Sequence, residues 1–363
     1  MNNRLITIQR FSLRKFKTFG SAGLILLLTI VIIANVYLRY KSGHSDRINS
    51  VAFSPDGKIL ASASRDSTII LWDVATGQQT CSLNTAGAAI LVAFSSDGKM
   101  LASGGINRPI ALWNLETCEL LQTFSHAHSS STRLLAFSPN NKILLSNGRE
   151  GEIEVWDTAT GKELRSFYLE DSLTDKDLRS SYRPTIIVNA ALSADGKLIA
   201  AGCFGEDENK PHDNTRIRLL ETETGDEMHS LDGNSKSYCA VAFLPDNKTI
   251  ASRCADGSFK LQDIVTGQVL RSFDKHPIKN NSLLFAISAN GNILATVGDE
   301  IKLWDLESGK ELRAINEFSH ATADETTALA LSPDGKTLAG GSWNKLVTWD
   351  VETGKQLHVL PAR

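Results

Sequence analysis

The stretch Val51-Ala52-Phe53-Ser54-Pro55-Asp56-Gly57-Lys58, followed by Trp72-Asp73 and Thr76-Gly77, decides the fold because variants of it recur along the chain. Seven copies are present. The positions equivalent to Trp72-Asp73 are Trp113-Asn114, Trp156-Asp157, Leu220-Glu221, Gln262-Asp263, Trp304-Asp305 and Trp349-Asp350. The intervals are 41, 43, 64, 42, 42 and 45 residues, so one copy carries an insertion and the others scarcely vary. Such a period indicates one repeated supersecondary unit.

Each copy predicts four short strands. In the first copy, residues 51–53 and 59–64 flank a Pro-Asp-Gly turn, which suits an antiparallel hairpin. Residues 69–72 form a third, β-branched run, and residues 78–83 form a fourth after the Thr-Gly turn. Seven such units predict an all-β fold, a seven-bladed β-propeller of four-stranded antiparallel blades over residues 47–361. The repeats fall at about residues 43–83, 84–124, 125–167, 168–231, 232–273, 274–315 and 316–360.

The phrase Phe-Ser-Pro-Asp-Gly-Lys-x-Leu-Ala-Ser, together with Trp-Asp, resembles the WD40-repeat family and in particular its bacterial members. The resemblance covers roughly residues 43–360. It implies a structural tetrad, which the first copy matches throughout as His44, Ser62, Asp66 and Trp72. It also implies a scaffold that binds other proteins, because the repeats encode a platform and not a reaction.

His44, Ser62 and Asp66 are also the residue types of a hydrolytic triad. We expect them instead to form a buried hydrogen-bond network that ties strands together. The sequence contains no nucleophile elbow, phosphate-binding loop or zinc-ligand pair, so we expect no enzyme activity, no cofactor and no metal. A quinone-type oxidoreductase is the remaining enzymatic alternative. The Trp usual after Thr-Gly-Lys in such propellers is absent here: the positions hold Phe167, Phe273 and Ile315.

The ends of the repeat region predict how the ring closes. The chain enters at the first strand of blade one and ends with the fourth strand of blade seven, at residues 356–360. We therefore expect seven contiguous blades without strand exchange, closed by packing between blades one and seven.

An apolar segment precedes the repeats. Residues 20–38 contain no charge, and as a helix they would span about 28 Å, close to the hydrocarbon thickness of a bilayer. A signal peptide is the alternative, but no small-x-small cleavage site follows. We therefore expect one transmembrane helix at residues 20–38, between a basic segment at 1–19 and a short linker at 39–46.

Charges flanking this helix predict its orientation. Five Lys or Arg residues precede it and three follow, which favours a cytoplasmic N-terminus and an extracytoplasmic propeller, in a periplasm or lumen. The basic segment either lies against anionic lipid or serves only to set the topology. The formal charge is −3, and seven positive charges within residues 1–41 leave −10 for the rest. This acidic propeller argues against nucleic acid as a partner.

Five cysteines show no metal-binding spacing. When the repeats are superposed, Cys239 and Cys254 fall opposite each other on adjacent strands of blade five. In an oxidising compartment they could form a disulfide, whereas in the cytosol they would be small buried hydrophobic residues. The sequence leaves both alternatives open.

The excess length of the fourth repeat lies in two loops, residues 169–184 and 205–215, which the resemblance places on one rim, the top. They carry the candidate binding residues Asp171, Asp175, Asp207 and His212. Cation binding is conceivable, although the spacing fits no EF-hand and solvated acidic loops are the alternative.

One turn position on the same rim holds Arg65, Arg149 and Trp343 in repeats one, three and seven. Arg and Trp are enriched at interaction hot spots, and Arg65 and Trp343 belong to neighbouring blades. The alternative is a half-covered Trp and two ordinary surface arginines.

These observations predict a single-pass membrane protein whose propeller binds protein partners through the top rim. The linker of about eight residues spans at most about 27 Å, so we expect this rim to face the membrane and the partner to lie in or beside it. The alternative function is a ligand- or ion-binding sensor that uses the central channel and the acidic loops. The sequence does not define an oligomeric state.

Overall fold

The computed structural model describes residues 43–106, 108–124, 132, 134–148, 152–169, 186–204, 215–232, 239–278, 283–315, 326–343 and 345–360. His44–Ala362 form one compact unit, the propeller, described below. Within the described residues, no helix is long and apolar enough to cross a membrane. The predicted helix at 20–38 lies outside them.

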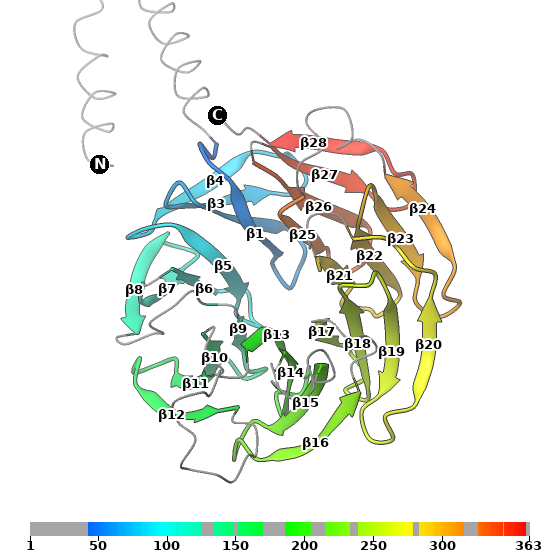
Figure 1. The fold of residues 1–363 in the computed structure, drawn as a ribbon. Helices are drawn as coiled ribbons and strands as arrows, with labels where there is room; N and C mark the ends of the chain where they lie inside the picture. Colours follow the sequence, from blue (N-terminus) through cyan, green and yellow to red (C-terminus); the bar gives the residue numbers. More distant parts are fainter. Residues whose placement is uncertain are drawn as a thin grey trace, which may run out of the picture. The chain divides into compact units, whose positions relative to one another are not determined.

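Seven four-stranded antiparallel sheets form the propeller, as predicted (Figure 1). The strands of blades one to four are β1 (Ile48–Phe53), β2 (Ile59–Ser64), β3 (Thr68–Asp73), β4 (Gln79–Asn84), β5 (Ala89–Phe94), β6 (Met100–Gly105), β7 (Ile110–Asn114), β8 (Glu119–Phe124), β9 (Leu134–Phe137), β10 (Ile143–Asn147), β11 (Glu152–Asp157), β12 (Glu163–Tyr168), β13 (Ile186–Leu192), β14 (Leu198–Phe204), β15 (Thr215–Glu221) and β16 (Glu227–Asp232). Those of blades five to seven are β17 (Cys239–Phe243), β18 (Thr249–Cys254), β19 (Phe259–Asp263), β20 (Val269–Phe273), β21 (Phe285–Ile287), β22 (Ile293–Val297), β23 (Ile301–Asp305), β24 (Glu311–Ile315), β25 (Ala328–Leu331), β26 (Thr337–Gly341), β27 (Leu346–Asp350) and β28 (Gln356–Leu360).

The recurring polar residues form the turns within each blade. Between β1 and β2, the Ser54 hydroxyl donates to Asp56 Oδ1 at 2.7 Å and accepts from the Ile59 N–H at 2.9 Å. Gly57 has φ of 72°, which favours glycine at this position. Between β3 and β4, Asp73 Oδ1 accepts from the N–H and hydroxyl of Thr76, at 2.8 and 2.6 Å. These bonds explain why Ser-x-Asp-Gly and Asp-x-x-Thr recur.

The hydrophobic core lies largely between blades. The first strand of each blade is innermost and the fourth is outermost (Figure 1). One core cluster joins blade one to blade seven, with Ile48, Trp72 and Leu346 at most 1% exposed. A blade alone could not bury these faces, so the ring is stable only when closed.

Ring closure follows the prediction. Each sheet among the described residues contains four strands that are consecutive in the chain, so no strand is exchanged. Blades one and seven meet through packing and through hydrogen bonds, of which two involve the backbone of Ile48. The Ile48 N–H donates to Ser342 O at 3.2 Å, and the Thr327 hydroxyl donates to Ile48 O.

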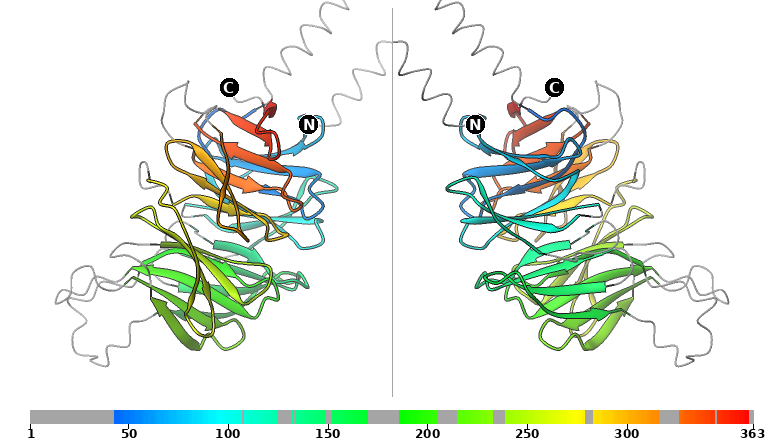
Figure 2. Two further views of the ribbon diagram at one scale, coloured as in Figure 1. Left: turned by 90° about the vertical axis from the view of Figure 1, so that its right-hand side faces the viewer. Right: turned by 90° about the vertical axis from the view of Figure 1, so that its left-hand side faces the viewer.

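Strand alternation divides the connections between two rims, which Figure 2 shows from the side. The turns between first and second strands, and between third and fourth strands, form what we call the lower rim. The turns between second and third strands, and the connections between blades, form the upper rim. The strands that flank the two insertions of the fourth repeat, β12 with β13 and β14 with β15, have their facing ends at the upper rim. The inserted residues lie outside the described part of the chain.

Candidate interaction surface on the upper rim

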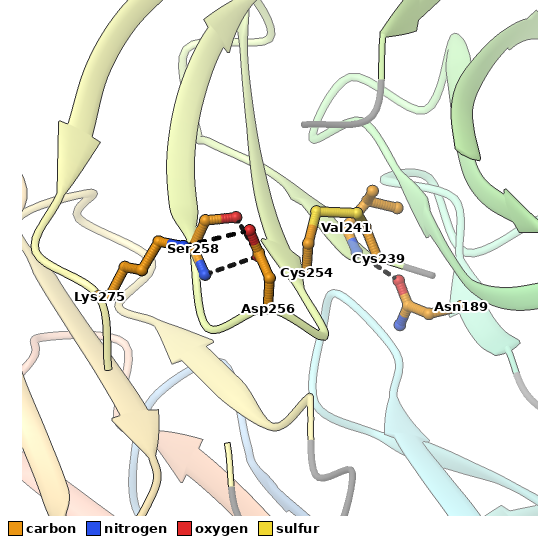
Figure 3. Close-up of a disulfide and its surroundings, with 7 residues drawn as sticks. All are labelled: Asn189, Cys239, Val241, Cys254, Asp256, Ser258 and Lys275. Carbon is orange, nitrogen blue, oxygen red and sulfur yellow. Dashed lines mark hydrogen bonds and ion pairs between the residues drawn. A yellow bond between two sulfur atoms is a disulfide. The ribbon is translucent and has the colours of Figure 1, made fainter. Parts of the chain in front are cut away.

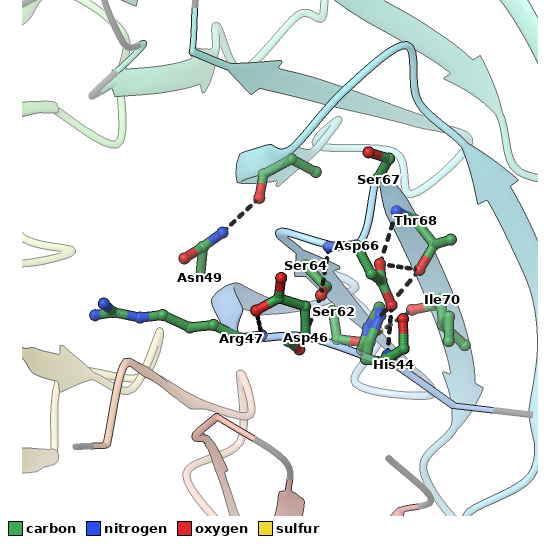
Figure 4. A network of polar contacts seen from close by, with 12 residues as sticks. His44, Asp46, Arg47, Asn49, Ser62, Ser64, Asp66, Ser67, Thr68 and Ile70 are labelled. Atoms are coloured by element: carbon green, nitrogen blue, oxygen red, sulfur yellow. Dashed lines mark hydrogen bonds and ion pairs between the residues drawn. The ribbon is translucent and has the colours of Figure 1, made fainter. Parts of the chain in front are cut away.

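The predicted tetrad forms one connected network in blade one, and Figure 4 shows three of its members, His44, Ser62 and Asp66. His44 Nε2 lies 2.6 Å from Ser62 Oγ, and Trp72 Nε1–H donates to the same oxygen at 2.8 Å. On the other side of the ring, His44 Nδ1 lies 3.3 Å from Asp66 Oδ2 and 3.0 Å from Thr68 Oγ1. Ser62 is 0% exposed, so it contacts its own blade and not a substrate.

Asp66 is the ionised end of this network. Burial alone would raise the pKa of Asp66, but hydrogen bonds from His44, Thr68 and the Ser45 N–H outweigh burial and hold this pKa below its usual value. The Asp66 carboxylate therefore holds His44 and Ser45, the residues that precede the first strand of blade one.

Other blades keep parts of the tetrad. The indole N–H groups of Trp113, Trp156 and Trp304 donate to Ser103, Ser146 and Thr296, at 2.8, 3.0 and 2.9 Å. In blade six, His276 Nδ1 lies 2.8 Å from Thr296 Oγ1, so this blade also has a His partner that the sequence analysis missed. Burial first, and the Arg253 charge second, lower the pKa of His276 to about 4.

Arg65 and Trp343, the predicted rim residues, are joined by Arg47, which was not predicted. Trp343 is 46% exposed, and its ring lies 5.5 Å from the guanidinium carbon of Arg47. The Arg65 N–H donates to Arg47 O at 2.9 Å. Figure 4 shows the Arg47 side chain extending away from the His44–Asp66 network. The structure thus brings Arg65 and Trp343 to one seam, between blades one and seven.

The remaining predicted rim residues lie outside the described part of the chain: Arg149, Asp171, Asp175, Asp207 and His212. Among the described residues, no group of three or more His, Cys, Asp or Glu side chains could hold a metal ion.

Ile106 is a further exposed residue of the upper rim. It directly follows β6, as Arg65 follows β2, and it is 52% exposed. Superposition of the repeats could have identified it, because it occupies the Arg65 position in blade two.

Two disulfides are present. Cys239 on β17 bonds to Cys254 on β18, which resolves the two alternatives for this pair (Figure 3). Cys81 on β4 bonds to Cys118, in the turn after β7, and so links blades one and two. The sequence analysis recognised no pattern of disulfides and did not predict this second one, because it joins residues of different repeats. The fifth cysteine, Cys203, is buried and belongs to neither disulfide.

Comparison with known proteins supports the repeat assignment. Residues 36–73, 118–157, 225–263 and 312–350 match the model of the WD40 family (WD domain, G-beta repeat). The protein is thus a seven-bladed propeller in which four segments match WD40 repeats.

Individual relatives match only parts of the chain. The periodic tryptophan protein 2 homolog of Dictyostelium discoideum is 25% identical over 180 residues, 48% of this chain and 18% of the relative. A guanine nucleotide-binding protein subunit beta of Oryza sativa subsp. indica is 25% identical over 31% of this chain and 32% of its own length. The small ribosomal subunit protein RACK1 of Caenorhabditis elegans is 30% identical over 32% of this chain and 37% of its own length. The chain thus spans well under half of each relative.

Proposed function

We propose that this protein is a membrane-anchored WD40-type scaffold that binds protein partners, without catalysis, through the upper rim of its propeller. The observation that carries the proposal is the seam between blades one and seven, where Arg47 stacks on the exposed Trp343 beside Arg65. Arg and Trp dominate the binding energy of many protein interfaces. The tetrad holds this seam in place, because His44 and Asp66 anchor the chain directly before Arg47.

The relatives support a role in assemblies. Two of them are, by name, a subunit of a guanine nucleotide-binding protein and a protein of the small ribosomal subunit. A propeller of formal charge near −10 also favours a protein partner over nucleic acid.

Two arguments support an extracytoplasmic propeller. The charges that flank residues 20–38 favour a cytoplasmic N-terminus. The disulfides Cys81–Cys118 and Cys239–Cys254 are expected to persist in an oxidising compartment, such as a periplasm or lumen. The sensor alternative depended on acidic loops outside the described residues, and no observation favours it over the scaffold.

The rim proposal is tested by purifying the tagged full-length protein from its own cells in mild detergent. Proteins that co-purify are quantified for wild type and for a rim variant, Arg65→Glu/Trp343→Ala. The control variant Lys58→Glu/Val265→Ala changes two exposed residues of the lower rim. The proposal predicts that partners lost by the rim variant are retained by the control. Equal retention by both variants would show that the upper rim is not the binding surface.

The topology is tested separately by protease digestion of a C-terminal tag in sealed spheroplasts. Digestion without lysis is expected. Protection until lysis would place the propeller in the cytoplasm.

A further inference from the structure

Close contacts link the seam described above to blade two. Thr85 N–H donates to Ser67 O at 2.9 Å, and the Thr85 hydroxyl donates to Gly87 O at 2.6 Å. A Cβ atom at Gly87 would lie 2.8 Å from Arg108 Nε, so this guanidinium lies directly against the Gly87 backbone. The connection between blades one and two therefore contacts both the turn that follows Arg65 and the Arg108 side chain. We call the surface formed by Arg47, Arg65, Arg108, Ile106 and Trp343 the arginine arc.

The arginine arc is basic, although the propeller as a whole is acidic. Arg65 and Arg108 are exposed, and Arg47 is half-buried. Among the described residues, no ion pair joins these arginines to a carboxylate.

The two nearby carboxylates already have other partners. Asp46 Oδ1 accepts from the Arg47 N–H at 2.7 Å. Asp66 is bound by His44, Thr68 and the Ser45 N–H. No hydrogen bond joins the exposed Arg65 and Arg108 side chains to another described residue, so these two guanidinium groups are open to another molecule, whereas Arg47 Nε is buried.

Exposed apolar side chains stand at both ends of the arc. Trp343 is 46% exposed and Ile106 is 52% exposed, whereas the other five Trp residues are at most 6% exposed. Repeats seven, one and two place Trp343, Arg65 and Ile106 at equivalent turn positions of consecutive blades. A charged centre flanked by apolar positions fits a segment that carries both acidic and apolar side chains.

We propose that the arginine arc binds an acidic protein segment that carries an aromatic or branched apolar residue. This inference rests on the proposed function and names the chemistry of the partner. Guanidinium groups bind carboxylates through paired, charge-assisted hydrogen bonds, and Trp343 and Ile106 provide apolar contact. The acidic remainder of the propeller repels such a segment, which directs it to the arc and suppresses binding elsewhere.

The test is an unbiased selection with a random 12-residue peptide library displayed on phage, against the full-length protein in detergent. Enriched peptides are synthesised with a fluorophore, and Kd is measured by anisotropy for wild type, Arg65→Glu, Arg108→Glu and Trp343→Ala. We expect enriched peptides rich in Asp and Glu with at least one apolar residue. Each substitution should weaken their binding at least about tenfold, and added salt should weaken it further. The lower-rim variant Lys58→Glu should bind within about twofold of wild type.

Other outcomes would overturn the inference. These outcomes are a selection without enriched peptides, enrichment of non-acidic peptides, or a Kd that none of the three substitutions changes.

A membrane surface is the competing occupant, and Trp343 reports on it, because it is the only exposed Trp. Quenching of its emission by brominated anionic lipid in nanodiscs, absent from Trp343→Phe, would assign the arc to lipid. If the rim variant loses its cellular partners while selected peptides are not acidic, the proposed function stands and this inference fails.

Discussion

The guanidinium carbon of Arg47 lies 5.5 Å from the centre of the Trp343 ring, although 296 positions separate the two residues. Ring closure creates this contact, since it brings the first strand of blade one beside blade seven. The surface proposed to bind partners therefore exists only in the closed propeller, and its integrity depends on the seam beneath it.

Ile48→Ala should destabilise this seam. Ile48 is 0% exposed and lies in the core cluster shared by blades one and seven. The loss is expected to be about 2–5 kcal/mol, because truncation of a buried Ile leaves a cavity. Ile106→Ala is the matched control and should change the free energy of unfolding by less than about 0.5 kcal/mol. Urea unfolding measures both variants, and equal stability of the two would mean that the seam is not critical.

Ser62→Ala should cost more than Ser103→Ala. Ser62 Oγ is hydrogen-bonded to both His44 and Trp72, so its removal leaves two buried polar groups without that partner. In the described part of the chain, Ser103 Oγ has a single side-chain hydrogen bond, which the Trp113 indole donates. We expect about 1–3 kcal/mol for Ser62→Ala and a smaller loss for Ser103→Ala. A larger loss in blade two, by thermal or urea unfolding, would contradict the special role of the blade-one network.

His276 predicts a pH dependence of stability. Its pKa falls from 6.5 to about 4 on folding, so the unfolded chain binds the proton more readily between these values. Stability should therefore decrease as pH is lowered from 6.5 to 4. His276→Gln cannot titrate and should show a flatter dependence of Tm on pH in this window. Identical slopes for the two proteins would rule out His276 as the titrating group.

The two disulfides predict a defined peptide map. Protein from an oxidising compartment, alkylated in denaturant without reduction, should be labelled at Cys203 alone. Non-reducing mass spectrometry should identify Cys81–Cys118 and Cys239–Cys254 peptides. Cys81→Ser/Cys118→Ser should lose about 2–5 kcal/mol of stability. Labelling of all five cysteines would show that the protein is reduced, and would remove this support for an extracytoplasmic propeller.

The sequence was sufficient to predict features that recur in the repeats, and insufficient to predict contacts between different blades. Blade number and strand number follow from motifs that recur in the copies, and the His44 tetrad follows from the complete motif of the first copy. Cys81–Cys118 and Arg47–Trp343 join different blades, so they depend on how the blades pack. The sequence analysis missed His276 because blade six departs from the spacing of blade one. Thr296 and Trp304, its partners in the network, are 8 residues apart, whereas Ser62 and Trp72 are 10 apart.

Site-specific photo-cross-linking in living cells tests the central claim most directly. A photoreactive amino acid replaces Ile106 on the upper rim in one strain and Val265, 76% exposed on the lower rim, in another. Partner binding through the upper rim predicts discrete cross-linked protein products from position 106 and none of them from position 265. The same products from both positions, or products from position 265 alone, would contradict it.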